Sequence, residues 1–169
     1  EQIAAETDIA KGTLYNHFPV KEAILDEFVR RSFQEHNAER IARVRALPDT
    51  RARMDAVLLD LVGGILRGPE LFERYFSYRI RQMLALRQEE TAASGFHQLE
   101  SEVIRLGQAE GDIRTDLPDK LLLALFEFTF VEIAQSYYTD PAAFDAQRIS
   151  EQCIELFMFG AHRKENHHV

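Results

Sequence analysis

Residues 3–23 read IAAETDIAKGTLYNHFPVKEA. The stretch predicts a short helix that ends near residue 6, a tight turn at residues 7–9 and a second short helix over residues 11–18. Pro19 ends the second helix, because proline can neither donate a backbone hydrogen bond nor fit the preceding turn. This spacing is typical of a helix-turn-helix. The small core that would set the angle between the two helices consists of Ile3, Ile9, Leu14 and Phe18.

The second helix carries outward-facing groups that suit a groove of duplex DNA. Its lysine can contact phosphates, its glycine lets the backbone come close, and its hydroxyl and imidazole groups can fix the register on the duplex. Asn16 could read an adenine edge. The candidate DNA-binding residues are Lys11, Gly12, Thr13, Tyr15, Asn16, His17 and Lys21.

The same stretch resembles the signature of the TetR family of transcriptional regulators. That pattern runs from small residues and a turn to Lys-Gly-Thr-Leu-Tyr, here residues 11–15, then a Phe three positions after the Tyr and Lys-Glu-Ala, here residues 21–23. The resemblance implies that the helix over residues 11–17 enters the major groove. It also implies that phosphates are held mostly by Thr13, Tyr15, His17 and Lys21.

Two positions depart from the family pattern. Asp8 stands where the family commonly has Gly, although Asp tolerates a left-handed turn better than most residues. Ala10 stands where Ser or Thr often caps the recognition helix, and the lost cap costs about 1 kcal/mol. The resemblance further implies a first helix before Glu1, either truncated or disordered, and we expect disorder.

Charge and cysteine content bear on the partners of the protein and on the compartment in which it acts. The chain has 169 residues and a formal net charge of −8, which by itself argues against a nucleic-acid partner because phosphates attract cations. Residues 9–21, however, contain no acidic residue. The single cysteine, Cys153, cannot form an internal disulfide, which favours a reducing compartment and predicts a cytoplasmic protein. No apolar run approaches the roughly 20 residues of a membrane span.

Helical spacing of apolar residues dominates the rest of the chain, so the predicted fold class is all-α. The expected domains are a helix-turn-helix DNA-binding region with its connecting helix over residues 1–47, and a ligand-binding and dimerisation domain over residues 48–169. We expect Asp49 or Thr50 to cap a helix and Gly111 to end one. The expected helices span about residues 20–46, 69–86, 88–110, 118–138 and 141–161, with one more between the linker at residues 47–50 and the break at Gly68-Pro69.

The middle helices carry the candidate effector site. Binding pockets are mostly apolar with a few placed polar groups, and these helices offer both kinds of side chain. The family resemblance is what implies a pocket here, whereas plain core packing stays open as the alternative for each residue. Further polar candidates are His97, Glu127 and Thr129. The predicted ligand-binding residues are Leu58, Leu61, Ile65, Phe72, Tyr75, Phe76, Tyr78, Arg79, Phe96, Phe126 and Phe130.

The last two helices are apolar on more than one face. A helix of this kind is buried on both sides, which predicts one face against the core and one against a second copy of the chain. The alternative is that both helices fill a monomeric core. The predicted dimer-interface residues are Leu121, Leu125, Phe128, Ile149, Cys153, Leu156, Phe157 and Gly160.

These features favour a ligand-responsive, DNA-binding transcriptional regulator: a homodimeric repressor that a small hydrophobic or aromatic effector releases from a palindromic operator. The alternative is a helical dimeric ligand carrier or protein-interaction module that keeps the fold without reading DNA. The sequence contains no nucleophile elbow, phosphate-binding glycine loop or zinc signature, so we expect no enzyme and no cofactor. We also expect no metal site, because the spacing of ligands is missing around His17, His36, His97 and His162.

Overall fold

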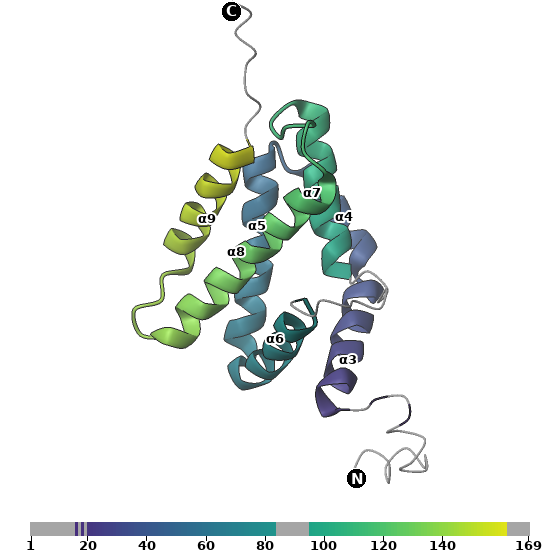
Figure 1. The fold of residues 1–169 in the computed structure, drawn as a ribbon, viewed down its shortest axis with the longest axis vertical. Helices are drawn as coiled ribbons and strands as arrows, with labels where there is room; N and C mark the ends of the chain where they lie inside the picture. Colours follow the sequence, from purple (N-terminus) through teal and green to yellow (C-terminus); the bar gives the residue numbers. More distant parts are fainter. Residues whose placement is uncertain (1–15, 17, 19, 84–94, 162–169) are drawn as a thin grey trace, which may run out of the picture.

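The computed structural model describes residues 16, 18, 20–83 and 95–161, and every regular element in this part of the chain is a helix. The all-α prediction is therefore confirmed. None of these helices is long and apolar enough to cross a membrane. The helices are α3 (Lys21–Glu35), α4 (Asn37–Ala46), α5 (Thr50–Arg67), α6 (Pro69–Met83), α7 (Gly95–Glu110), α8 (Asp119–Thr139) and α9 (Ala146–Ala161) (Figure 1).

Local sequence signals set several helix ends as predicted. The carboxylate of Asp49 accepts a hydrogen bond from the backbone N–H of Ala52 at 2.8 Å and so caps α5. Gly68 separates α5 from α6, which begins at Pro69. Helix α7 ends before Gly111, whose φ of +88° lies in the left-handed region that glycine adopts without strain.

Two predicted helices have different bounds. The single helix expected over residues 20–46 is divided at His36 into α3 and α4, because its polar middle has no continuous apolar stripe to bury. The last helix begins at Ala146 instead of Pro141. Asp140 caps only a turn, accepting hydrogen bonds from the N–H groups at 142 and 143, whereas Asp145 accepts one from Arg148 N–H at 3.0 Å and caps α9.

Helix α5 provides the centre of the core and packs against α6, α7, α8 and α9 (Figure 1). Its inward side chains recur three and four residues apart, as one face of a helix requires. Burying each large apolar side chain contributes about 1.5–3 kcal/mol relative to exposure. The buried core includes Met54, Val57, Leu58, Val62, Ile65, Leu99, Val103, Ile104, Leu122, Phe126, Phe130, Ile133, Ile154 and Phe157.

An ion pair joins α4 to α7. The guanidinium of Arg45 in α4 donates from Nε to Glu102 Oε1 in α7 at 2.6 Å, and Arg105 donates to the same carboxylate at 2.7 and 2.9 Å. The Glu102 side chain is nearly buried, and the hydrogen bonds from Arg105 and Arg45 lower its pKa to about 2. Asn37 of α4 adds a second link through its amide to Gln98 of α7.

We predict that Glu102→Gln lowers the free energy of unfolding by about 1–3 kcal/mol at pH 7, the usual range for hydrogen bonds to a charged group. Because folding lowers the pKa of Glu102 from 4.5 to about 2, its contribution is complete above pH 4.5 and is lost as the pH falls towards 2. Denaturant unfolding at several pH values measures the free energy of unfolding of both proteins. The difference in this free energy between variant and wild type should decrease as the pH falls from 4.5 towards 2. Glu70→Gln, at an exposed position on α6, is the matched control, and a difference that does not change with pH would contradict the prediction.

Candidate DNA-binding segment and effector site

The structure describes two of the predicted DNA-binding residues. Asn16 is exposed, and Lys21 is exposed at the first position of α3. The other five lie outside the described residues: Lys11, Gly12, Thr13, Tyr15 and His17. Helix α3 packs against α6 and α7 and is followed directly by α4. The predicted recognition segment therefore leads directly into helices that contact the rest of the bundle.

Most of the predicted effector residues belong to one apolar cluster formed by side chains of α5, α6, α7 and α8. Leu58, Ile65 and Phe126 are fully buried. The Phe96 and Phe130 rings lie 4.4 Å apart between centroids, and the Phe126 and Phe130 rings 5.4 Å apart. On α6, the stacked rings of Phe72 and Phe76 lie 5.5 Å apart. The other members of the predicted set, all partly buried, are Leu61, Tyr75, Tyr78 and Arg79.

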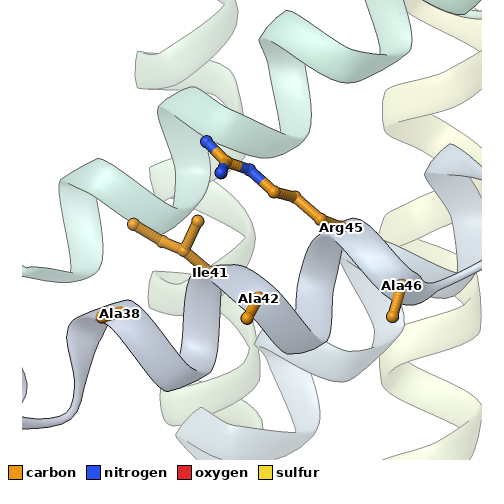
Figure 2. A pocket seen from close by; sticks show the side chains of 5 residues that line it. All are labelled: Ala38, Ile41, Ala42, Arg45 and Ala46. Carbon is orange, nitrogen blue, oxygen red and sulfur yellow. The ribbon is translucent and has the colours of Figure 1, made fainter.

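Two hollows on the described surface lie away from these residues. One is an open hollow on α4 lined by Ala38, Ile41, Ala42, Arg45 and Ala46 (Figure 2). Figure 2 shows the longer side chains, Ile41 and Arg45, directed towards the neighbouring helix. The other hollow lies where α8 ends, between residues 132 and 144. Neither is lined by a predicted effector residue. We name the rings of Phe72, Phe76, Phe96, Phe126 and Phe130, which pack in these contacts, the aromatic layer.

Charged and polar side chains from four helices converge beside this aromatic layer. Arg79 of α6 faces Asp26 of α3, with Nε and Oδ1 3.8 Å apart. His97 of α7 lies near two carboxylates: its Nδ1 is 3.5 Å from Glu127 Oε1 and 3.8 Å from Glu100 Oε2. We name this group the junction cluster, and its members are Asp26, Tyr75, Arg79, His97, Glu100 and Glu127.

Tyr75 belongs to the cluster through its burial and its charged neighbours. Burial raises the pKa of its phenol to about 12, because the charged phenolate would lose its water. The positive charge of Arg79 opposes this rise, whereas the carboxylates of Asp26 and Glu100 add to it. The phenol therefore stays protonated at neutral pH and keeps an O–H donor available in the cluster.

Glu100 is the most unusual member of the cluster. Its side chain is fully buried, and neither carboxylate oxygen accepts a hydrogen bond within the described part of the chain. Burial raises the pKa of Glu100 well above its ordinary value, and the nearby charge of Glu127 raises it further. Sequence reasoning missed this residue. The available signal was its position on the inward stripe of α7, between the buried Leu99 and Val103.

The predicted dimer residues divide into two groups. Leu121, Leu125 and Phe128 form an exposed stripe along α8, and Leu156 of α9 is 78% exposed. By contrast, Cys153 and Phe157 are buried in the core of their own chain, and Ile149 packs against that core, because these positions face α5 and α8. Ile149, Cys153 and Phe157 therefore offer little surface for contact with a second chain. Gly160 lies in α9, but its surroundings are outside the described residues.

Helix α9 lies at one edge of the bundle and contacts α8, which runs across the middle of the view from near α7 (Figure 1). Sequence reasoning missed Phe159 of α9, which is 91% exposed. Exposed apolar side chains on two adjacent helices are typical of a protein interface when they form one patch. We name this surface the α8–α9 face, formed by Leu121, Leu125, Phe128, Leu156 and Phe159.

Two solved structures share this arrangement of helices. A protein of unknown function from Rhodococcus sp. RHA1 superposes with a TM-score of 0.60 at 20% identity, over 96% of this chain and 84% of that one. The transcriptional regulator FadR from Bacillus subtilis, in complex with stearoyl-CoA, superposes with a TM-score of 0.55 at 17% identity, over 95% of this chain and 87% of that one. At these identities the likeness concerns the fold.

A family model matches the beginning of the chain. No curated protein is similar enough in sequence to count as a relative. Residues 1–28 match the family described as bacterial regulatory proteins, tetR family, and this range contains the whole predicted helix-turn-helix. Residues 1–28 are therefore similar to the N-terminal region of the tetR family, and the chain as a whole shares the helical fold of FadR.

Proposed function

We propose that the chain is a homodimeric repressor that binds a palindromic operator and is released by a small hydrophobic or aromatic effector. The family match over residues 1–28 carries the proposal, because it includes every candidate DNA-binding residue from Lys11 to Lys21. The α8–α9 face supports the dimer. Two copies joined there would present two recognition helices to two half-sites.

The aromatic layer and the junction cluster support the effector class. An apolar effector would separate the rings of Phe96 and Phe130, which now pack against each other, and place a polar end near Tyr75 and Arg79. Pockets commonly combine an apolar lining with a few polar groups of this kind. The complex of FadR with stearoyl-CoA also favours an effector with a large apolar part.

The contacts of α7 suggest how an effector would reach the DNA-binding segment. Helix α7 contacts α8 on one side and both α3 and α4 on another. An effector that moves α7 would displace α4 through the Arg45–Glu102 ion pair, and α3 with it. We propose that this alters the spacing of the two recognition helices. It releases DNA only if the effector binds the free state more tightly than the DNA-bound state.

We predict that Lys21→Ala weakens binding of the full-length protein to duplexes selected from random DNA. Each dimer would lose two phosphate contacts, so the slope of log K against log salt should become shallower by about 2. Fluorescence anisotropy at several salt concentrations measures both quantities. Lys120→Ala, at the exposed start of α8, is the matched control and should leave both unchanged. An unchanged affinity and slope for Lys21→Ala would contradict the assignment.

We predict that Leu125→Glu converts the dimer to a monomer, because it places a charge in the apolar α8–α9 face of each copy. Sedimentation velocity at micromolar concentration measures the change. Leu71→Glu is the matched control, since Leu71 is similarly exposed but lies on α6, and this variant should stay dimeric. A monomeric wild type, or a dimeric Leu125→Glu variant, would contradict the proposed interface.

A further inference from the structure

We infer that His97, Glu100 and Glu127 form a binding site for a divalent transition-metal ion, Zn²⁺ in the first instance, between α7 and α8. One ligand atom from each residue lies within 4.8 Å of the other two. Imidazole nitrogen and carboxylate oxygens together form a common donor set for Zn²⁺. Mg²⁺ and Ca²⁺ prefer oxygen ligands alone, so this mixed set favours the transition metal.

The two distances from His97 to the carboxylates are close to those of a tetrahedral site. Zn²⁺ binds nitrogen and oxygen at about 2.0–2.2 Å, which places two ligand atoms about 3.3–3.6 Å apart. His97 Nδ1 lies 3.5 Å from Glu127 Oε1 and 3.8 Å from Glu100 Oε2. His97 and Glu100 are three residues apart on α7 and therefore share one face of the helix, and α8 supplies Glu127 from the opposite side.

The burial of Glu100 is a second and independent indication. A fully buried carboxylate without a hydrogen bond is costly unless a cation or a proton neutralises it. Arg79 is the cation that faces Glu100 electrostatically, but it is partly exposed and lies 3.8 Å from Asp26. A divalent ion at the position facing His97 would neutralise Glu100 and Glu127 together. Three protein ligands would also leave one coordination position for water or for a group on an effector.

The proposed metal site does not depend on the proposed regulatory function. It is built from α7 and α8 alone, whereas DNA binding depends on the segment that precedes α3. Binding of the metal can therefore be measured on the protein without DNA. A failure to bind any operator would leave that measurement unaffected, and the absence of metal binding would leave the DNA-binding proposal unaffected.

The test is the affinity of the full chain for Zn²⁺, measured by competition with a chromophoric chelator after removal of bound metal. His167 and His168 are changed to Ala in every sample, so that the adjacent imidazoles near the C-terminus do not contribute. We expect one ion per chain, and a rise in Tm of about 5 °C or more at a Zn²⁺ concentration about 100 times the Kd. Mg²⁺ at the same concentration should have little effect.

Three variants test the ligands. His97→Ala, Glu100→Gln and Glu127→Gln should each weaken Zn²⁺ binding at least tenfold, and His97→Ala should also change the visible spectrum of bound Co²⁺. Glu100→Gln should keep or raise the Tm without metal, since it removes a buried carboxylate. A loss of binding in this variant thus cannot be attributed to unfolding. Glu132→Gln, at an exposed position on α8, is the matched control and should bind like the wild type.

Two results would overturn the inference. The first is a wild type that binds Zn²⁺ no more tightly than the variant in which all three ligands are changed. The second is a Glu100→Gln variant with the wild-type Kd and stoichiometry. Either result would mean that a proton, and not a metal ion, neutralises Glu100 in the folded protein.

Discussion

Helix α7 packs against α3, α4, α5 and α8, and this packing determines how the junction cluster is placed relative to α3 and α4. Its apolar stripe, with Leu99, Val103 and Ile104, is buried in the common core, so the helix cannot shift without disturbing its neighbours. The Arg45–Glu102 ion pair ties the same helix to α4. Helix α7 therefore connects the junction cluster to the helices that follow the DNA-binding segment.

The same helix places a carboxylate where the core would otherwise be apolar. Glu100 lies on the buried stripe of α7 beside the aromatic layer, with Tyr75, Arg79 and Glu127 around it. Perturbed titratable groups of this kind concentrate at functional sites, because burying them without a ligand reduces stability. A ligand that neutralises this cluster would bind beside α7, which contacts α3, α4, α5 and α8.

Much of this architecture follows from local sequence. The helix-turn-helix signature is a run of about twenty consecutive residues, and the ends of helices at Asp49, Pro69 and Gly111 follow from capping and backbone geometry. The break at His36 was not predicted, because the polar middle of this segment weakens the helix but no proline, glycine or side-chain cap marks where it divides. The start of α9 was equally ambiguous, since Asp140 and Asp145 can both accept backbone hydrogen bonds and only one of them leads into a helix.

The direction in which side chains point from each helix was the second feature that the sequence did not predict. On α9, Leu156 and Phe157 are adjacent in sequence but about 100° apart around the helix, so one is exposed and the other lies in the core. Glu100 was missed because a charged residue is normally expected on the solvent side of a helix, although its position between Leu99 and Val103 pointed to the buried stripe. Which side chains of α7 and α9 are buried can be decided only from the tertiary packing, whereas the family signature is visible in the sequence.

The most direct test of the account is native mass spectrometry of the full-length protein with a palindromic duplex obtained by selection from random DNA. The account predicts a complex of two chains on one duplex, formed in preference to a scrambled duplex of equal length. A protein that forms no complex, binds as a single chain or does not distinguish the two duplexes would contradict it.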